Sequence, residues 1–335
     1  MSLEDYGWND RFAQKFLPHA QQGLLPARVI RGEKNYFRVI CAKGELTVRF
    51  AGKMRHQADG RQDLPVVGDW VAVEPQTEPG RGIIHAVLER FSSFARNLPG
   101  RRKGKGRERI EQQVIAANVE RVFIVCGLDQ DFNLRRIERY LTLVTAGGAE
   151  AVVVLNKSDL SSESETQLQQ VIAIAGKAPV ERISAKNRAQ VDQLKVYSRA
   201  GETLAFLGSS GVGKSTIINA LLDEERQKVA AVSTAVGKGR HTTTHRELFL
   251  LSGGGVLMDN PGMRELHLWG EEEDLAESFA DIEALALKCR FSDCGHQTEP
   301  SCAVRAALGS QQFDEQRLDS YLRLKEELSH LQRRR

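Results

Sequence analysis

Residues 203–215 read TLAFLGSSGVGKS. The apolar run TLAFL predicts a buried strand, and the run IINALL at residues 217–222 predicts a helix. The pattern GxxxxGK(S/T) lies between them, in the strand–loop–helix context that a phosphate-binding loop requires. Glycines there let backbone N–H groups surround phosphate oxygens, the lysine supplies positive charge, and the serine hydroxyl ligates Mg²⁺. The residues predicted to bind the phosphates of a nucleotide are Gly208, Ser209, Ser210, Gly211, Val212, Gly213, Lys214, Ser215 and Thr216, with Ser215 also a Mg²⁺ ligand.

A phosphate-binding loop does not distinguish adenine from guanine, so the base must be recognised elsewhere. Residues 156–159 read NKSD, follow the apolar run AVVVL, and resemble the NKxD motif of GTPases. The carboxylate of Asp159 can accept both the N1–H and the N2–H₂ donors of guanine. Asn156 and the stem of Lys157 would then hold the loop and cover the base. Taken alone, NKSD at a strand end could also cap a helix.

A second loop, Ser184-Ala185-Lys186, follows the run VERI and resembles the SAK motif, in which a backbone amide meets the guanine O6. The tripeptide is short and weak by itself. However, NKSD and SAK follow consecutive predicted strands, and open α/β sheets bind ligands at the carboxyl ends of their strands. Ser184 and Ala185 therefore join Asn156, Lys157 and Asp159 in a predicted GTP site.

Two further segments fit a Mg²⁺–GTP site. Residues 259–262 read DNPG, follow the run VLM, and resemble the DxPG form of the Walker B and switch II motif. Asp259 is expected to reach Mg²⁺ through water, and Gly262 to donate its N–H to the γ-phosphate. Residues 239–244 read GRHTTT, where Thr243 or Thr244 would ligate Mg²⁺ when GTP is bound.

The catalytic group is harder to assign. Met263 stands where Ras-like GTPases carry the glutamine that positions the attacking water. His241 is the local candidate, because a histidine beside the γ-phosphate can orient or polarise water. An exposed histidine without a catalytic role is the alternative. A potassium-assisted route would need an asparagine at Gly211 and is disfavoured.

The motifs occur in a permuted order, because Lys157 precedes Lys214 whereas ordinary GTPases begin with the phosphate-binding loop. Amphipathic segments at 133–145 and 164–175 separate the early strands, which predicts a largely parallel, doubly wound α/β sheet. Residues 24–96 instead show short β-branched runs broken by glycine, proline and polar turns, which predicts a small antiparallel barrel. The strands predicted for the α/β sheet are 121–125, 151–155, 180–183, 204–207, 248–251 and 256–258.

Three cysteines and a histidine gather near the carboxyl end. Cys289, Cys294, His296 and Cys302 have the ligand types and short spacing of a tetrahedral structural Zn²⁺ site. The alternative is a set of four buried, reduced side chains. The other two of the five cysteines, Cys41 and Cys126, lie among apolar residues and are expected to pack.

Composition narrows the class of protein but does not determine its function. The chain is 41% hydrophobic and 27% charged, as expected of a globular protein, and its net charge of +3 is too small to establish nucleic-acid binding. Six basic residues do gather at 101–109, either as a solvated linker or as a contact for RNA phosphates. No apolar run is long enough to span a bilayer and no signal peptide is evident, so the cytoplasm is the expected compartment.

These motifs together resemble the RsgA (YjeQ) family of circularly permuted, ribosome-dependent GTPases. The resemblance runs from about residue 25 onward and rests on VVGDWV, QVIAANVERVFIV, NKSD, SAK, GSSGVGKST, GRHTTT, DNPGM and CRFSDCGHQTEPSCAV. It implies an N-terminal all-β OB-fold barrel, a central permuted P-loop GTPase domain and a C-terminal, mainly helical zinc domain. The expected boundaries are 1–23 for an N-terminal extension, 24–98 for the OB-fold, 99–110 for a basic linker, 111–270 for the GTPase domain and 271–335 for the zinc domain.

The family also implies a function. A Mg²⁺-dependent GTPase would convert GTP to GDP and phosphate late in maturation of the 30S ribosomal subunit, would be stimulated by that subunit, and would contact 16S rRNA but no membrane. Independently of the family, we expect a monomer. Two departures are an amphipathic extension over the first 22 residues and Asn260, where serine or threonine is more usual. Two other functions stay open: a nucleotide-gated RNA-binding module in which hydrolysis is incidental, and a P-loop kinase or ATPase.

Overall fold

The computed structural model of the chain describes residues 2–33, 36–57, 60–98, 111–129, 132–209, 211–223, 246–260, 280–291, 294–297, 299–309, 318, 321, 322 and 325. The chain divides into two compact units, Met1–Glu265 and Leu266–Arg335. Within the described part of the chain, we find no helix with both the length and the apolar character that a membrane span needs.

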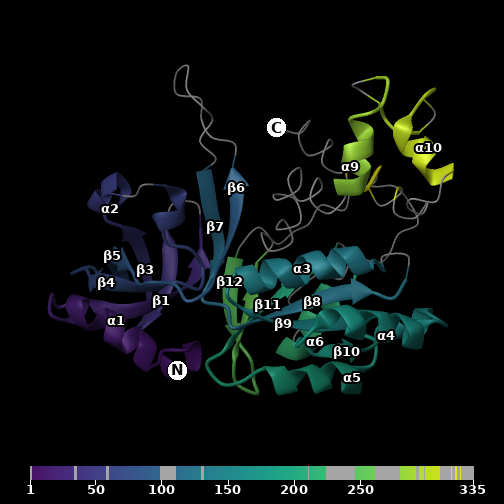
Figure 1. Ribbon diagram of the computed structural model, residues 1–335. Coiled ribbons are helices and arrows are strands. Elements are labelled where there is room, and N and C mark those ends of the chain that lie inside the picture. Colours follow the sequence, from purple (N-terminus) through teal and green to yellow (C-terminus); the bar gives the residue numbers. More distant parts are fainter. Residues whose placement is uncertain are drawn as a thin grey trace. The chain divides into compact units, whose positions relative to one another are not determined.

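Five strands of the first unit close into a barrel (Figure 1). β1 pairs with β2 and β4, β2 with β3, and β4 with β5, all antiparallel, whereas β3 and β5 run parallel. Alternate residues of β3 are buried, as the two-residue period of a strand with one face toward a core requires. This circuit is a five-stranded OB-type barrel and confirms the predicted fold class. Its strands are β1 (Leu25–Gly32), β2 (Phe37–Cys41), β3 (Gly44–Phe50), β4 (Trp70–Pro75) and β5 (Arg81–Val87), with α2 (Gly52–Gln57) and η2 (Arg61–Asp63) between β3 and β4.

The N-terminal extension packs on this barrel. It forms η1 (Glu4–Tyr6) and α1 (Asp10–Ala20), and the side chain of Asn9 caps α1 by accepting from the Phe12 N–H at 3.4 Å. Phe12 and Phe16 are buried, and the ring of Trp8 lies 4.8 Å from that of Trp70 on β4. The amphipathic pattern of the first 22 residues therefore marks a helix that covers the barrel.

A two-stranded antiparallel ribbon, β6 (Ser93–Leu98) with β7 (Glu111–Ala117), follows the barrel strands. The basic residues at 101–109 lie in the segment that joins these two strands, outside the described residues. Phe94 pairs with Ala116 but Ala95 pairs with Val114, so Ile115 is an extra residue on β7. This arrangement is a β-bulge.

The hydrogen-bonded sheet continues beyond the barrel, because β12 pairs antiparallel with β1, Arg31 with Glu247 and Gly32 with Arg246. Its α/β part, which we call the second sheet, has the strand order β10-β9-β8-β11-β13-β12 and is parallel except for β12, which runs antiparallel to β13. Its central strands β8, β11 and β13 are buried along their whole length, as expected of a sheet covered on both faces. The six predicted strands are therefore confirmed. They are β8 (Arg121–Gly127), β9 (Glu150–Asn156), β10 (Val180–Arg182), β11 (Thr203–Leu207), β12 (Arg246–Leu250) and β13 (Val256–Asp259).

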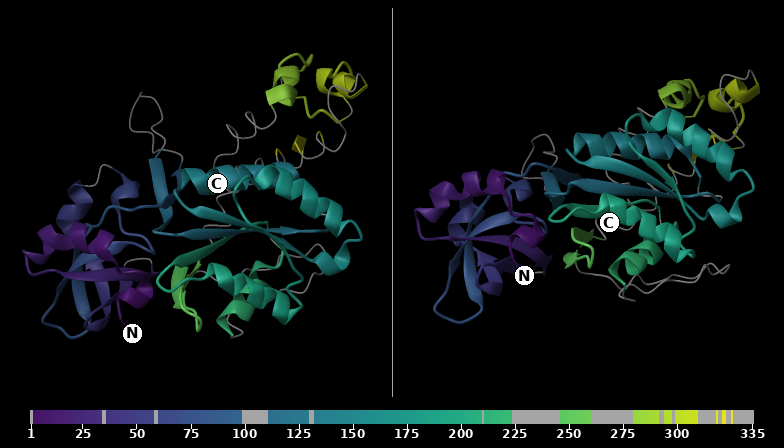
Figure 2. Two further views of the ribbon diagram at one scale, coloured as in Figure 1. Left: turned by 60° about the horizontal axis from the view of Figure 1, so that its bottom comes forward. Right: turned by 90° about the horizontal axis from the view of Figure 1, so that it is seen from below.

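Helices cover both faces of this sheet (Figures 1 and 2). Phe123, Val125 and Val152 pack with residues of α5 (Arg188–Gln193) and α6 (Lys214–Leu222), whereas Val153 and Leu155 pack with residues of α3 (Leu134–Ala146) and α4 (Ser164–Ala175). Successive strand residues thus contact opposite layers, and the sheet is doubly wound. Short η3 (Ser158–Leu160) and η4 (Leu194–Tyr197) complete the connections. Cys41 and Cys126 are buried, as predicted.

The second unit is mainly helical where it is described. It contains α9 (Ala280–Ala286) and α10 (Ala303–Gly309), and Leu318, Tyr321, Leu322 and Lys325 are also helical. Ile282, Val304, Leu318 and Tyr321 form its buried core together with Cys294 and Cys302. The remainder of the predicted last helix, through Leu331 and the terminal arginines, lies outside the described residues.

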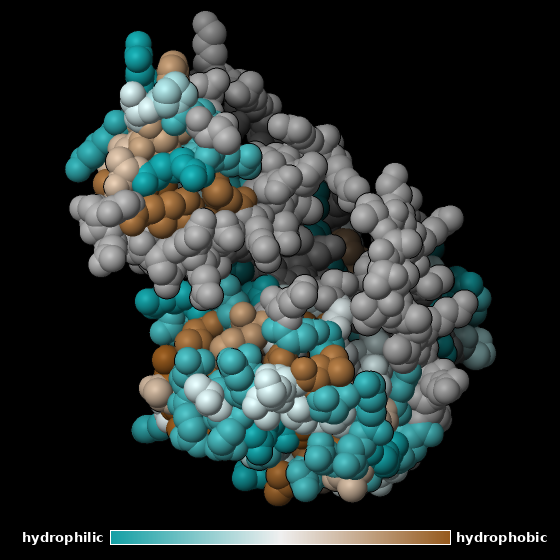
Figure 3. All heavy atoms as spheres, turned by 90° about the vertical axis from the view of Figure 1, so that its right-hand side faces the viewer, coloured by the Kyte–Doolittle hydropathy of each residue, from teal (hydrophilic) through white to brown (hydrophobic). Residues whose placement is uncertain are grey.

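Hydrophilic residues predominate among the described residues on the face shown in Figure 3. On the face shown in Figure 3, hydrophobic residues gather only in small patches among hydrophilic ones. Exposed apolar side chains such as Leu160, Ile172 and Val196 come from separate elements of the first unit. Scattered apolar residues of this kind are ordinary on globular proteins.

Candidate nucleotide site and metal centre

The phosphate-binding loop connects β11 to α6, as the sequence predicts. Gly208 and Gly213 have positive φ angles of 146° and 101°. A Cβ at Gly208 would lie 2.2 Å from the Val125 carbonyl oxygen, and one at Gly213 would lie 2.1 Å from Asn156 Nδ2. Both positions therefore require glycine. Lys214 begins α6, is 5% exposed, and donates from Nζ to the Gly208 carbonyl at 2.6 Å and to that of Ser209.

Asn156 joins three of the predicted motifs. It ends β9, is buried, and donates from Nδ2 to the carbonyl of Val212 in the phosphate-binding loop at 2.7 Å. Its Oδ1 accepts from the backbone N–H of Ala185 at 2.8 Å. One amide side chain thus connects the NKSD, SAK and phosphate-binding loops, and the segments predicted to read the base lie beside those predicted to hold phosphates.

The carboxylate of Asp159 faces the SAK loop. Its Oδ1 accepts from Ser184 Oγ at 2.7 Å, and its Oδ2 lies 2.8 Å from Lys186 Nζ. The hydrogen bond from Lys186, followed by that from Ser184, holds the pKa of this carboxyl below its usual value. The group therefore stays ionised at neutral pH. About a third of the side chain is exposed, so a carboxylate able to accept paired N–H donors is accessible at the loop surface.

Lys157 has a partner that the motifs do not predict. Its Nζ lies 2.6 Å from Oδ2 of Asp129, two residues beyond the end of β8, and both side chains are partly buried. Lys157 also adopts the left-handed backbone conformation with φ 64°, which is uncommon for a residue other than glycine. The sequence contains one signal for Asp129 as a site residue. It follows a predicted parallel strand, and so belongs to the sheet edge at which NKSD also lies.

The Walker B segment follows the central strand β13. Asp259 ends that strand and is 6% exposed. The next residue, Asn260, is 5% exposed and donates from Nδ2 to the carbonyl of Ile115 on β7 at 2.6 Å. Because β9, β11 and β13 are parallel members of one sheet, Asp259 lies at the same edge as Asn156 and the phosphate-binding loop. Ser215 and Thr216 lie in the first turn of α6.

Several predicted site residues lie outside the described part of the chain. They are Ser210, His241, Thr243, Thr244 and Gly262, and Met263 lies there too. Their places in a nucleotide site stay predictions.

The four predicted zinc ligands come together in the second unit. Their ligand atoms all lie within 4.8 Å of one another. His296 Nδ1 is 3.6 Å from Cys289 Sγ and 3.5 Å from Cys302 Sγ, and the two sulfurs are 3.9 Å apart. A tetrahedral Zn²⁺ with Zn–S bonds of about 2.3 Å separates two sulfurs by about 3.8 Å. The donor set therefore fits a closed structural zinc site.

The surroundings suit metal binding. Burial lowers the pKa of His296, which favours the neutral imidazole that a metal requires. Cys302 lies just before α10 and accepts at Sγ from the Arg305 backbone N–H at 3.5 Å. Ile282 and Tyr321 pack around the cysteines. The cluster is thus built into the small core of the unit.

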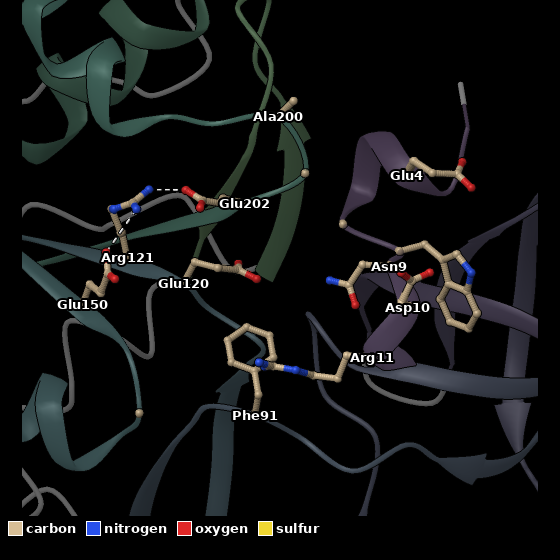
Figure 4. A pocket seen from close by; sticks show the side chains of 14 residues that line it. Glu4, Asn9, Asp10, Arg11, Phe91, Glu120, Arg121, Glu150, Ala200 and Glu202 are labelled. Carbon is tan, nitrogen blue, oxygen red and sulfur yellow. Dashed lines mark hydrogen bonds and ion pairs between the residues drawn. The ribbon is translucent and has the colours of Figure 1, made fainter. Parts of the chain in front are cut away.

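A separate cavity of about 820 Å³ lies between the N-terminal extension and the second sheet (Figure 4). Arg121 and Glu150, which begin β8 and β9, line it and form an ion pair at 3.0 Å, and Glu202 precedes β11. The nucleotide motifs follow the opposite, carboxyl ends of these strands. The cavity therefore does not belong to the nucleotide site.

Comparisons with known proteins identify the family to which this sequence and fold belong. The family model described as RsgA GTPase matches residues 87–269. The small ribosomal subunit biogenesis GTPase RsgA of Syntrophotalea carbinolica is 46% identical over 98% of this chain and 90% of its own. The crystal structure of YjeQ from Thermotoga maritima aligns with a TM-score of 0.55 and 28% identity over 91% of this chain and 98% of that one.

A further solved structure, of YloQ, described as a circularly permuted GTPase, shares the fold with a TM-score of 0.50 and 21% identity, covering 92% of this chain and 96% of that one. The permuted motif order and the sheet around the phosphate-binding loop thus have a structural counterpart. Family model, relatives and fold all lead to one assignment: the chain belongs to the RsgA GTPase family.

Proposed function

We propose that this GTPase acts in late maturation of the small (30S) ribosomal subunit, that binding to that subunit stimulates it, and that the exchange of GTP for GDP controls its binding and release. The supporting observation for the nucleotide is Asn156, whose amide joins the base-reading loops to the phosphate-binding loop. The ribosomal part is supported by the names of relatives, such as the small ribosomal subunit biogenesis GTPase of Syntrophotalea carbinolica.

In the proposed site, Asp159 accepts the N1–H and N2–H₂ groups of guanine, and the Ala185 backbone N–H donates to O6. Adenine presents no such pair of donors, so the carboxylate discriminates against it. For GTP to bind in this way, Lys186 must release at least part of its contact with Asp159. Lys157 covers the base with its stem, and Asn156 and Ser184 hold the two loops in register.

Phosphate binding is assigned to the segment 208–216. Backbone N–H groups of its turn surround the phosphate oxygens, and Lys214 supplies charge to the β- and γ-phosphates. Ser215, Asp259 through water, and Thr243 or Thr244 would hold Mg²⁺, which when bound neutralises charge on the phosphates. Gly262 donates its N–H to the γ-phosphate.

For hydrolysis, we assign His241 to orient the attacking water. The position after Gly262 is Met263, whose side chain cannot hydrogen-bond to water as a glutamine does. An imidazole beside the γ-phosphate can orient or polarise the nucleophile, an effect that typically accelerates a reaction by about 10²–10⁴-fold.

The proposed ribosomal contacts involve the OB-type barrel, the basic residues at 101–109 and the zinc-binding unit, with 16S rRNA as the nucleic-acid partner. OB-type barrels bind single-stranded nucleic acid through one sheet face and adjoining loops. The Cys₃His cluster would hold one structural Zn²⁺ ion. A cytoplasmic monomer is the form we assign.

The test is GTP turnover with and without purified 30S subunits. We expect the subunit to raise kcat by at least about tenfold, which corresponds to ~1.4 kcal/mol of added transition-state stabilisation. Unchanged turnover would contradict the ribosome-dependent part and leave the intrinsic GTPase assignment intact.

A second measurement addresses His241. The substitution His241→Ala should lower kcat without weakening the binding of a non-hydrolysable GTP analogue, whereas His19→Ala, on the helix that covers the barrel, should change neither. If His241→Ala hydrolyses GTP at the normal rate but binds 30S subunits less tightly, the residue serves binding and not catalysis.

A further inference from the structure

The bulge on β7 places one backbone carbonyl outside the regular ladder of the β6–β7 ribbon. Ile115 is the extra residue, between Val114 and Ala116, which pair with Ala95 and Phe94. The extra residue of a bulge is left unpaired by the neighbouring strand. Bulges of this kind often lie next to functional sites, where they redirect a polar or side-chain group.

The carbonyl of Ile115 accepts a hydrogen bond from Asn260, the residue directly after the Walker B aspartate. The distance from Asn260 Nδ2 to the carbonyl oxygen is 2.6 Å, and Ile115 and Asn260 are 0% and 5% exposed. A buried carbonyl requires a partner, and here the partner comes from a residue 145 positions away in sequence. The bulge therefore presents a carbonyl that the Asn260 side chain satisfies.

The far end of β7 contacts the barrel. Gly68, in the turn before β4, approaches so closely that a Cβ there would lie 2.1 Å from the Ala117 carbonyl oxygen and 2.8 Å from Met258 Cε on β13. Asn118 Nδ2 donates to the Gly68 carbonyl at 3.1 Å. Val66, Val114 and Ala117 form a small buried cluster between the turn and the strand. β7 thus contacts Asn260, just beyond the end of β13, as well as the barrel.

We propose that Asn260 is a positioning residue that couples the γ-phosphate state of the nucleotide site to β7, and through β7 to the OB-type barrel. The proposal rests on the assignment of Asp259 and the segment after it to GTP binding. Gly262, the proposed N–H donor to the γ-phosphate, is two residues from Asn260 in sequence, so GTP and the Asn260–Ile115 hydrogen bond both favour one position of Asp259 and Asn260 at the end of β13. GDP lacks the γ-phosphate and gains nothing from that position.

Such coupling is reciprocal. If the hydrogen bond stabilises the position of Asn260 that favours γ-phosphate binding, then GTP must stabilise the hydrogen bond and, with it, the bulged part of β7. The proposal also explains why asparagine occupies this position in DNPG. Its amide offers N–H donors, and its side chain is long enough to reach the Ile115 carbonyl on β7.

The decisive variant is Asn260→Asp, which keeps the shape of the side chain and replaces the donor N–H₂ group by an oxygen that repels the Ile115 carbonyl. We expect its affinity for a non-hydrolysable GTP analogue to fall by about fivefold or more, with GDP affinity changed less than about twofold. The matched control is Asn9→Asp, because the oxygen that caps α1 is retained and aspartate caps as well as asparagine.

A second readout follows β7 directly. In the wild-type protein, amide hydrogen exchange of residues 111–117 should be slower with the GTP analogue than with GDP. In Asn260→Asp that difference should disappear. A merely structural role for Asn260 would instead raise exchange equally with both nucleotides. If Asn260→Asp is too unstable to assay, Asn260→Ser, which keeps a shorter donor, should show the same loss of GTP preference to a smaller degree.

The proposal is overturned if Asn260→Asp weakens GDP and the GTP analogue by the same factor, or if the wild-type protein exchanges β7 amides identically with both nucleotides. Failure of the proposed function looks different: the wild-type protein would then bind ATP as well as GTP or fail to bind either. The two outcomes are therefore distinguishable in one set of measurements.

Discussion

Asp159 accepts hydrogen bonds from two donors, the neutral hydroxyl of Ser184 and the charged ammonium group of Lys186. Both lower the pKa of the carboxyl, so the ionised form persists well below neutral pH. A guanine reader needs this charge, because both base donors are N–H groups. Base recognition should therefore be insensitive to pH between about 6 and 8, because this range lies above even the ordinary pKa of an aspartate, about 3.9.

Replacing Asp159 with Asn should change which base is bound. The amide offers an N–H where the carboxylate offers an acceptor, so it opposes the N2–H₂ of guanine and suits the oxygen that xanthine carries there. Loss of a bidentate pair costs about 1–3 kcal/mol, or roughly 5- to 150-fold in GTP affinity. Competition binding with GTP, ATP and xanthosine triphosphate measures this change.

The control for that experiment is Asp192→Asn, an exposed aspartate on α5 that pairs with Lys195 and Arg188. It should leave base preference unchanged. If Asp159→Asn kept full GTP selectivity, the guanine would have to be read by another group, and the assignment of NKSD would be wrong.

Asp129 offers a milder test of the same site. Because its ion pair with Lys157 is only partly buried, Asp129→Asn should weaken GTP and GDP binding together by roughly 1.5- to 5-fold, the equivalent of ~0.2–1 kcal/mol. Fluorescent-nucleotide titration measures both. The exposed pair of Arg135 and Glu138 supplies the control Glu138→Gln, which should not alter either affinity. Unchanged affinities in Asp129→Asn would show that Lys157 needs no such partner.

At the scale of elements, α1 is the least expected part of the fold. Phe12 is 1% exposed and its ring lies 5.5 Å from that of Trp70, so the helix completes the outer side of the barrel. Phe12→Ala should lower the free energy of unfolding by about 3–5 kcal/mol, because it removes a large buried ring and leaves a cavity. Denaturant unfolding followed by tryptophan fluorescence measures this loss.

Leu17, on the same helix, is 61% exposed and makes a matched control. Leu17→Ala should change stability by no more than about 0.5 kcal/mol. Equal effects of the two substitutions would mean that α1 is not packed on the barrel in solution.

Local patterns predicted most of the elements. Short runs such as AVVVL and TLAFL are apolar throughout, and the structure places both as buried strands of a covered sheet. The pairing of β6 with β7 could not be predicted from the sequence. The register of two strands depends on which of their residues face the same core, and neither strand shows this by itself. The bulge at Ile115 could not be predicted either, because no residue of β7 indicates it and its hydrogen-bond partner, Asn260, follows a strand of another sheet.

The residues of the candidate site also fall into two groups, those that the sequence predicts and those that only the assembled fold brings together. The phosphate-binding loop and NKSD are continuous motifs with a fixed chemical reason for each residue, so sequence alone predicts them. Asp129 and the partner of Asn260 lie on separate elements and become evident only when the strands are assembled. Packing of α1 on the barrel likewise depends on Trp70 and Phe91, which no local pattern connects to Phe12.

For the whole molecule, permutation changes connectivity but not the edge of the sheet at which the motifs lie. β9, β11 and β13 run parallel, so their loops meet although the base-reading strand precedes the phosphate-binding strand in sequence. A buried arginine reinforces the junction with the barrel. Arg28 on β1 donates to the Asn118 carbonyl at 3.0 Å and to Thr203 Oγ1, at the start of β11, at 2.7 Å.

The second unit should depend on its metal more than on its apolar core. Below roughly 70–80 residues a single core rarely supplies more than about 3–5 kcal/mol, and small domains need a further constraint such as zinc. We therefore expect Cys294→Ala to lose bound zinc and the helical structure of Leu266–Arg335. Nucleotide affinity should be retained, because the described nucleotide motifs lie in Met1–Glu265.

Zinc content by atomic emission, helicity by circular dichroism and GDP affinity by fluorescence separate these effects. A substitution is preferable to a chelator, since a chelator would also remove Mg²⁺. Cys41→Ala, at a buried cysteine of the barrel, provides the control and should keep the zinc. Full zinc content in Cys294→Ala would contradict the four-ligand site. Loss of GDP binding along with the zinc would instead mean that the two units fold as one, so that the metal supports the nucleotide site as well.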